Sequence, residues 1–134
     1  MLKLQVILGS TRPGRAGEEV AQWVTEIAKE NPDFEVELVD VVDYNLPLLD
    51  EPKSALTGEY SQDHTKKWSA KIAEADAYIF VTAEYNHGVP AALKNAVDFL
   101  YHEWTDKVFG FVSYGATEGG ARAVEHWRQI ISQL

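Results

Sequence analysis

The sequence predicts an α/β fold in which a doubly wound parallel sheet lies between two layers of helices, a three-layer α/β/α arrangement. Segments with strand character alternate with segments of helical spacing in the order β-α-β-α-β-α-β-α. Such alternation favours a parallel sheet with helices on both faces. The continuous apolar run at 77–81 is typical of a strand covered on both faces. The 134 residues fit one domain, covering 1–134.

The first half of the chain contributes two strands and one helix. Residues 2–8 begin with alternating apolar positions and end in an apolar run, which predicts a strand. After a polar loop at 9–17, one apolar stripe with helical spacing is formed by Val20, Trp23, Val24, Ile27 and Ala28. The Asn31-Pro32 pair ends this helix. Residues 34–38 alternate apolar side chains with glutamates, which predicts a strand near the sheet edge with one wet face.

The middle of the chain is irregular before it returns to the same alternation. The stretch 41–58 contains two prolines and a glycine and predicts no regular element. A helix is expected at about 65–75, with Trp68, Ile72 and Ala75 on one side. Because Trp23, Trp68 and Trp127 all lie in helical stripes, we expect all three in the core.

The last part of the chain repeats the pattern from Pro90, which suits the first turn of a helix. The stripe of that helix is Leu93, Ala96, Val97, Leu100 and Tyr101. A strand at 108–114 and a loop at 115–120 follow, and the final helical stripe is Val124, Trp127, Ile131 and Leu134.

The number of strands is unusual for this architecture. A doubly wound sheet of the flavodoxin type has five strands in the order 2-1-3-4-5, whereas the sequence yields four. We therefore expect a flavodoxin-like domain without its fifth strand, incomplete at the C-terminal side. The strand at 108–114 then has an unpaired edge.

The composition excludes several kinds of site. Without cysteine the chain has no disulfide, thiolate metal site or cysteine nucleophile, and its acidic residues show no metal-ligand spacing. The net charge of −9 disfavours nonspecific binding to nucleic acid. No apolar run approaches the ~20 residues that span a bilayer, and the N-terminus does not read as a signal peptide. We expect a soluble, cytoplasmic protein that binds neither nucleic acid nor membrane.

The first loop with chemical character follows the first strand and contains Ser10, Thr11, Arg12, Gly14 and Arg15. Backbone N–H groups at a helix N-terminus favour an anion. Hydroxyl donors and arginines grip phosphate oxygens, and glycine allows a close backbone approach. The pattern is neither G-x-G-x-x-G nor a Walker loop. The alternative is an ordinary turn in which Ser10 or Thr11 caps the helix and both arginines are solvated.

The second loop follows the strand at 77–81 and contains Glu84, Tyr85, Asn86 and His87. Its backbone groups could face a flat heterocycle, with Tyr85 against the ring. The alternative is a capped turn in which Glu84 favours a helix dipole. His87 has no visible partner and is interpreted as a turn or surface residue rather than an acid or base.

The third loop follows the strand at 108–114 and contributes Ser113, Tyr114, Gly115 and Gly119. Its glycines let the main chain pass close to a ligand, and the alternative is a flexible loop with a helix cap at Thr117. Ligands in open α/β sheets bind beyond the carboxyl ends of the strands. Because all three loops lie at that end, the sequence predicts one site there.

These loops resemble those of the NADPH-dependent FMN reductase family, which includes flavin, quinone and azo reductases of flavodoxin-like fold. The likeness covers nearly the whole chain. Its motifs are Gly9-Ser10-Thr11-Arg12-Pro13-Gly14-Arg15, Glu84-Tyr85-Asn86-His87-Gly88, the helix start Pro90-Ala91-Ala92-Leu93-Lys94-Asn95-Ala96-Val97-Asp98, and Ser113-Tyr114-Gly115 with Gly119-Gly120. Two departures are Ala83, where the family often has proline, and the absent fifth strand.

The resemblance implies FMN as cofactor and NADPH or NADH as reductant. Ser10, Arg12 and Arg15 would bind the FMN phosphate, while the second and third loops would line the isoalloxazine ring. The cofactor performs the chemistry, so no catalytic side chain is predicted. The electron acceptor would be a small molecule such as a free flavin, a quinone or an azo compound. Two other interpretations stay open: a flavodoxin-type FMN electron carrier without NAD(P)H turnover, and an inactive interaction domain.

The sequence also predicts a homodimer or homotetramer with the site near the interface. The irregular stretch carries the apolar cluster 46–49, and the segment 101–104 offers aromatic side chains as interface anchors. The family resemblance implies the same assembly. The alternative is that 46–49 folds back over its own sheet.

Overall fold

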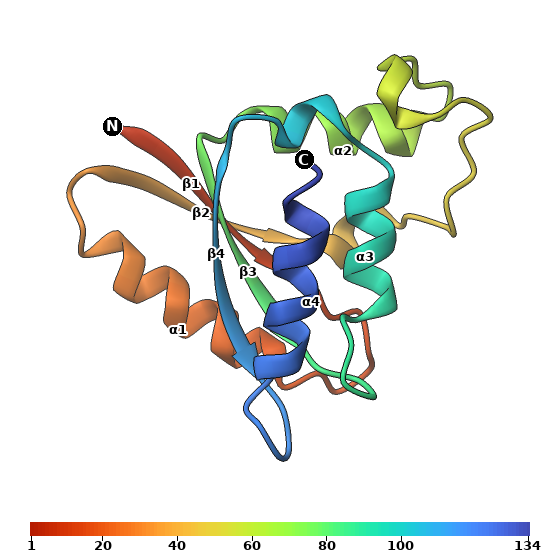
Figure 1. The fold of residues 1–134 in the computed structure, drawn as a ribbon. Helices are drawn as coiled ribbons and strands as arrows, with labels where there is room; N and C mark the ends of the chain where they lie inside the picture. The colour runs from red at the N-terminus through yellow and green to blue at the C-terminus, as the bar shows by residue number, and fades with distance from the viewer.

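The computed structural model describes all residues from 1 to 134, and they form a four-stranded parallel sheet between two layers of helices (Figure 1). The strands lie in the order β2-β1-β3-β4, which confirms the predicted fold class and strand order. The elements are β1 (Leu2–Leu8), α1 (Gly17–Lys29), β2 (Phe34–Asp40), α2 (Asp63–Ala73), β3 (Ala77–Ala83), α3 (Ala91–Asp98), β4 (Val108–Tyr114) and α4 (Ala121–Ile131). Short 3₁₀ turns occupy Val41–Tyr44, Ala55–Thr57 and His102–Trp104.

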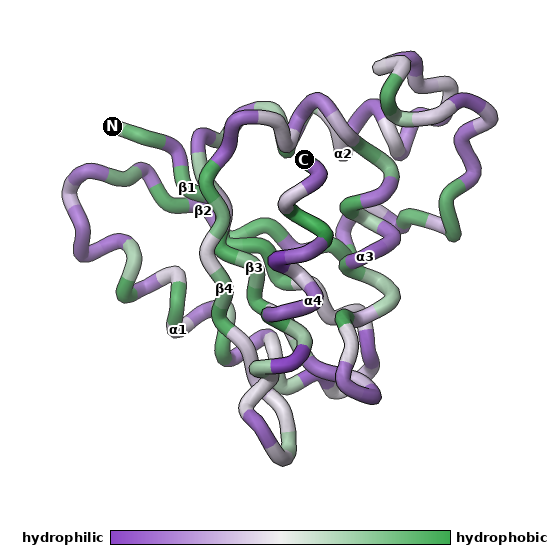
Figure 2. The backbone as a smooth tube through the Cα atoms, viewed as in Figure 1, coloured by the Kyte–Doolittle hydropathy of each residue, from purple (hydrophilic) through white to green (hydrophobic).

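Alternation along the strands divides the interior into two cores, because successive side chains point to opposite faces of the sheet. Val6 and Leu8 pack under α1, whereas Ile7 joins a larger cluster beneath α2, α3 and α4. Phe80 lies at the centre of that larger cluster, with its ring 5.3 Å from that of Trp127 and 6.0 Å from that of Trp104. The central strands are accordingly the hydrophobic part of the chain (Figure 2).

Two expectations about aromatic residues were wrong. Trp23 was expected in the core but is 59% exposed. The buried stripe of α1 is Gly17, Ala21, Val24 and Thr25, and Trp23 lies on its flank. Trp104 was suggested as an interface anchor, with the core rim and the solvent-facing surface as alternatives, yet it is only 1% exposed and belongs to the larger core. The expectation for Trp68 and Trp127 is confirmed, since both are fully buried.

The helix from Pro90 ends three residues earlier than its apolar stripe suggested. α3 stops at Asp98, and the backbone N–H of Tyr101 binds the carboxylate of Glu103 at 3.2 Å instead of a helix carbonyl. Glu103 also accepts hydrogen bonds from Tyr60 Oη (2.9 Å) and Ser69 Oγ (2.6 Å). Glu103 therefore ties this corner to α2 within the subunit.

The irregular stretch after β2 is held by Asn95 on α3. Asn95 Nδ2 donates to the carbonyl of Pro47 at 2.7 Å, and Asn95 Oδ1 accepts from the N–H of Leu49 at 3.0 Å. Leu46 packs against the larger core, while Leu48 stays 84% exposed. The apolar cluster 46–49 thus folds back only in part.

The strand β4 has β3 as its one neighbour, so its other edge is unpaired. Val108, at its start, is 70% exposed. No helix of the chain combines the length and the apolar character that crossing a membrane requires.

Candidate functional site

The loops after β1, β3 and β4 meet at one end of the sheet, at the lower end of the molecule in Figure 1, and enclose a cleft of about 440 Å³. The residues that line it are Ser10, Arg12, Arg15, Ala16, Ala83, Glu84, Tyr85, Tyr114, Gly115 and Ala116. Seven of these were predicted from the sequence. The cleft lies within the range of about 300–1,000 Å³ that is usual for small-molecule sites.

The first loop places two arginines beside the cleft in different environments. Arg15 is partly buried, and its Nη1 donates to the carbonyl of Ser10 (2.6 Å) and to Asp40 Oδ1 (2.8 Å), while Nη2 donates to Asp40 Oδ2 (2.5 Å). Arg12 is exposed and has no ion-pair partner. Arg12 is therefore the cation of this loop that is available to a ligand.

The first loop also contradicts the ordinary-turn interpretation, in which a hydroxyl side chain caps α1. The N-cap residue is Ala16, and no side chain makes a capping hydrogen bond there. Ser10 is 4% exposed, and its Oγ accepts a long hydrogen bond from the N–H of Arg12 at 3.4 Å. Ser10, Arg12 and the N-cap residue Ala16 all line the cleft, an arrangement that suits an anion.

The second loop makes a tight, strained turn at its tip. Tyr85 N–H donates to the carbonyl of Gly88 (3.1 Å), and Gly88 N–H donates back to Tyr85 (2.9 Å). Between them Asn86 and His87 have φ values of 51° and 64°. This conformation is uncommon for residues with side chains and costs about 1–3 kcal/mol each, so such residues cluster at ligand sites. Tyr85 lines the cleft, while Asn86 and His87 are exposed at the tip.

Glu84 joins the second loop to the helix of the third. Its Oε1 accepts a hydrogen bond from the backbone N–H of Ala123 in the first turn of α4, at 2.7 Å. The sequence suggested that Glu84 interacts favourably with a helix dipole, and the helix whose N-terminal turn it contacts is α4. This bond therefore ties the second loop to the helix that follows the third loop.

The third loop forms another wall of the cleft. Ser113 Oγ donates to the carbonyl of Gly119 at 2.8 Å, and Gly119 and Gly120 have φ values of 61° and 85°. Burial raises the pKa of the Tyr114 phenol above its usual value. Tyr114 therefore keeps its proton at neutral pH and lines the cleft as an uncharged hydrogen-bonding group.

Six of the predicted residues do not line the cleft. Thr11 lines a separate cavity of about 210 Å³ beside the 3₁₀ turn Val41–Tyr44. The other five do not line the cleft either: Gly14, Asn86, His87 and Gly119 lie in the loops, and Ser113 lies in β4. Three residues that line the cleft were not singled out from the sequence, because their methyl side chains carry no chemical signature: Ala16, Ala83 and Ala116. The sequence also left Asp40 without a role, although the strand pairing of β1 with β2 could have indicated its place.

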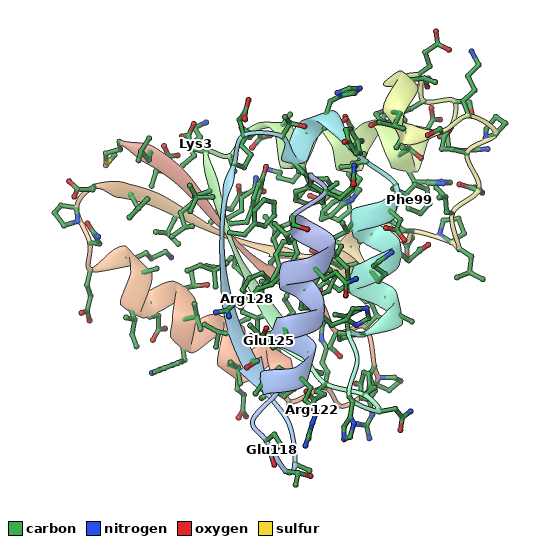
Figure 3. The ribbon with its side chains drawn as sticks, viewed as in Figure 1. Lys3, Phe99, Glu118, Arg122, Glu125 and Arg128 are labelled. Atoms are coloured by element: carbon green, nitrogen blue, oxygen red, sulfur yellow. The ribbon has the colours of Figure 1, made fainter.

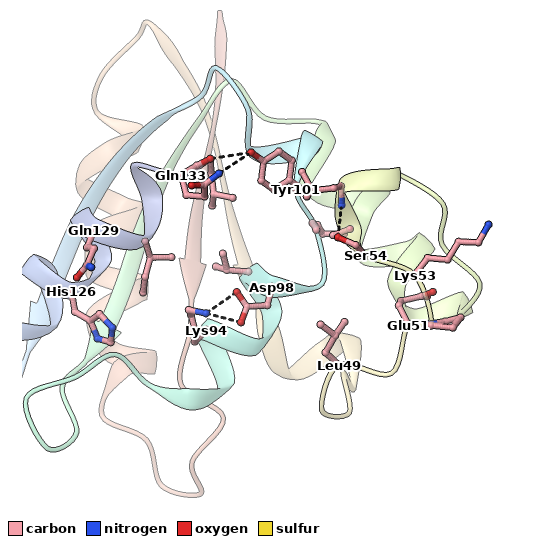
Figure 4. A pocket seen from close by; sticks show the side chains of 17 residues that line it. Leu49, Glu51, Lys53, Ser54, Lys94, Asp98, Tyr101, His126, Gln129 and Gln133 are labelled. Atoms are coloured by element: carbon pink, nitrogen blue, oxygen red, sulfur yellow. Dashed lines mark hydrogen bonds and ion pairs between the residues drawn. The ribbon is translucent and has the colours of Figure 1, made fainter.

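A larger groove of about 790 Å³ lies elsewhere, between the segment 49–56, α3 and α4 (Figure 4). We call it the α3–α4 groove. Its lysines are already paired, Lys94 with Asp98 at 2.7 Å and Lys53 with Glu59. Tyr101 Oη donates to the carbonyl of Gln133 at 3.1 Å. Despite its size, the groove offers no unpaired lysine or arginine to a phosphate, whereas the smaller cleft offers Arg12.

The contact between Glu84 and α4 gives a testable stability effect. Replacing Glu84 with alanine removes the acceptor for the Ala123 N–H, and loss of a helix cap costs about 0.5–2 kcal/mol. We expect the free energy of unfolding in urea to fall by about that amount. The matched control is Glu118→Ala, because Glu118 makes only an exposed contact with Arg122 at 3.8 Å (Figure 3). Equal losses in both variants would contradict the capping role.

Comparisons with known proteins identify the family of the chain. The family model described as NADPH-dependent FMN reductase matches residues 2–134. An NAD(P)H-dependent FMN reductase of Schizosaccharomyces pombe is 48% identical over 120 residues, which cover 88% of this chain and 60% of that protein. A second NAD(P)H-dependent FMN reductase, from a Nectria species, is 43% identical over 129 residues, covering 92% of this chain and 64% of that protein.

The fold is also similar to that of a solved structure. The flavoenzyme NAD(P)H:(acceptor) oxidoreductase of Paracoccus denitrificans superposes with a TM-score of 0.76 at 20% identity, covering 98% of this chain and 71% of that one. This chain spans less than two thirds of the length of the two fungal relatives. The match with the family model extends over nearly all of its residues, so the chain belongs to the NADPH-dependent FMN reductase family.

Proposed function

We propose that this chain is the FMN-binding domain of an oxidoreductase that uses NADPH or NADH and delivers electrons to a small acceptor such as a free flavin, a quinone or an azo compound. The observation that carries the proposal is the cleft at the carboxyl ends of β1, β3 and β4, which joins an unpaired arginine to two loops able to hold a flat ring. The names of the fungal relatives support the same activity.

The residues of the cleft suit the two ends of FMN. The phosphate is placed at the loop from Ser10 to Arg15, where Arg12 and the N-terminus of α1 oppose the charge of an otherwise acidic chain. The ring is placed between Tyr85 and Gly115, which line the cleft from the second and third loops. Bound FMN would supply hydride transfer between the pyridine nucleotide and the acceptor. The side chains bind and orient, and the backbone N–H groups of the loops stabilise charge at the ring edge.

A turnover assay separates this proposal from its two rivals. The purified chain, FMN and NADPH are mixed under air, and the absorbance of NADPH is followed over time. A reductase consumes NADPH only with both protein and FMN present. A flavodoxin-type carrier, which the charge of −9 would suit, binds FMN without consuming NADPH. An inactive interaction domain does neither, and either of these last two results would overturn the proposal.

His87 is expected to be dispensable for turnover. It sits exposed at the tip of the second loop and does not line the cleft. His87→Ala should keep NADPH oxidation within a few-fold of the unsubstituted chain. General acid–base catalysis typically contributes 10²–10⁴-fold, so a loss of about 10³-fold in turnover would show that His87 transfers a proton.

We also propose that the protein is cytoplasmic and assembles as a homo-oligomer, with a two-fold dimer as the simplest form. Exposed Leu48 and Leu49 support this assembly, together with the α3–α4 groove beside them. Trp104 does not contribute to such an interface, because it is buried in its own subunit. Light scattering should give about twice the chain mass of 15.0 kDa, and a species at the monomer mass that still turns over NADPH would refute the dimer.

A further inference from the structure

The structure assigns to Asp40 a positioning role in the phosphate site: Asp40 holds the guanidinium of Arg15, so that Arg15 shapes the loop and Arg12 is the one arginine that contacts the phosphate. This inference rests on the proposed function. The sequence suggested that both arginines bind the FMN phosphate, whereas the structure gives the two arginines different roles. Arg12 and Arg15 are the same residue type in the same loop. What distinguishes them is the set of contacts that each makes with its neighbours.

The contacts of Arg15 leave little of its guanidinium for a ligand. Two nitrogens engage both oxygens of Asp40, at 2.8 and 2.5 Å, and Nη1 also donates to the carbonyl of Ser10 at 2.6 Å. The third nitrogen, Nε, lies 4.0 Å from Glu18. The side chain of Arg15 is 14% exposed and that of Asp40 is 20% exposed. A phosphate would have to displace a two-point ion pair in a largely covered position, and such pairs are the strong ones.

Strand register explains why Asp40 is in the right place. In the parallel pairing of β1 with β2, Asp40 lies opposite Leu8, the last residue of β1. The loop that contains Arg15 starts immediately after Leu8, so both groups emerge side by side at the same end of the sheet. Asp40 is itself fixed, because its Oδ1 accepts from the N–H of Val42 at 3.1 Å.

The effect of this pair is to shape the main chain of the first loop. Arg15 links the end of β2 to the carbonyl of Ser10, the residue whose hydroxyl and backbone border the cleft. Arg12 lies between these two anchors, is exposed, and has no carboxylate within ion-pair distance. A loop held at Ser10 and Arg15 presents Arg12 to the cleft with its charge uncompensated.

The test compares affinities for FMN and for riboflavin, which shares the ring and ribityl chain but lacks the phosphate. Quenching of flavin fluorescence is measured for the unsubstituted chain and for Arg12→Ala, Arg15→Ala, Asp40→Ala and the double variant Arg15→Ala/Asp40→Ala, at low and high salt. Arg12→Lys and Arg15→Lys are included as milder changes. Circular dichroism checks that each variant is folded.

Three results are expected. Arg12→Ala lowers FMN affinity by about 10- to 100-fold, leaves riboflavin affinity unchanged and reduces the salt dependence of FMN binding. Arg15→Ala, Asp40→Ala and the double variant lose FMN affinity by the same factor, on the order of 10-fold, because the two residues act as one unit. Arg15→Ala and Asp40→Ala each keep the salt dependence of FMN binding. Arg12→Lys restores part of the affinity, whereas Arg15→Lys does not, since lysine lacks the planar fork.

Other outcomes overturn the inference. If Arg15→Ala abolishes the preference for FMN over riboflavin while Asp40→Ala keeps or increases FMN affinity, Arg15 contacts the phosphate directly. Additive losses at Arg15 and Asp40 would likewise contradict a single unit. A chain whose unsubstituted form binds no FMN would instead overturn the proposed function, and this assignment with it.

Discussion

Replacing Arg12 and Arg15 together with alanine is expected to weaken FMN binding by at least about 100-fold. Hydrogen bonds to charged groups contribute about 1.5–3 kcal/mol each, and this variant removes both the cation at the cleft and the anchor of its loop. The chain has a net charge of −9 and no other unpaired cation lining the cleft. A titration of the variant with FMN, followed by fluorescence, measures the effect.

The control removes the same amount of charge elsewhere. Lys29 lies in the last turn of α1, and Arg128 pairs with Glu125 at 2.8 Å on the exposed side of α4 (Figure 3). The variant Lys29→Ala/Arg128→Ala should keep most of its FMN affinity. Equal losses in both double variants would mean that net charge alone governs binding, and unchanged affinity without Arg12 and Arg15 would place the phosphate elsewhere.

The second large effect is expected at Gly120, the N-cap residue of α4. Its φ of 85° is a left-handed conformation, which costs other residues about 1–2 kcal/mol. A Cβ at this position would also lie 2.6 Å from the Cβ of Ser113 and 3.0 Å from the backbone nitrogen of Tyr114. Overpacking of this kind adds about 1–3 kcal/mol, so Gly120→Ala should be strongly destabilising and should distort the third loop.

Gly119 provides a matched control for conformation without crowding. Its φ is 61°, and a Cβ there would meet nothing within 4 Å. Chemical denaturation should show a loss of about 1–2 kcal/mol for Gly119→Ala and a clearly larger loss for Gly120→Ala. If the two variants lose the same stability, then the close approach of Gly120 to β4 does not restrict the size of the side chain at this position.

The sequence was sufficient to predict the sheet and the end of it that carries the site. Strand signals at 2–8, 77–81 and 108–114 are strong because the strands are short, apolar and bounded by loops, and parallel strands bring their carboxyl ends to one edge. The loop residues Ser10, Arg12, Tyr85 and Gly115 therefore line one cleft, as predicted.

Other features depended on tertiary contacts that local pattern does not contain. Trp23 follows the helical spacing of a core residue, but whether the flank of α1 is covered depends on neighbouring elements. The end of α3 was misplaced because Glu103 binds the N–H of Tyr101 from outside the helix. The partnership of Arg15 with Asp40 spans 25 positions in sequence, and only the register of β1 with β2 brings the two together.

The central claim is that FMN binds in the cleft formed by the loops after β1, β3 and β4. A crystal structure of the chain with FMN tests it most directly, because the protein has other cavities of suitable size and the α3–α4 groove is larger than the cleft. We predict phosphate density within hydrogen-bonding distance of Ser10 and Arg12, with the ring between Tyr85 and Gly115. FMN bound in the α3–α4 groove, with the cleft empty, would contradict this account.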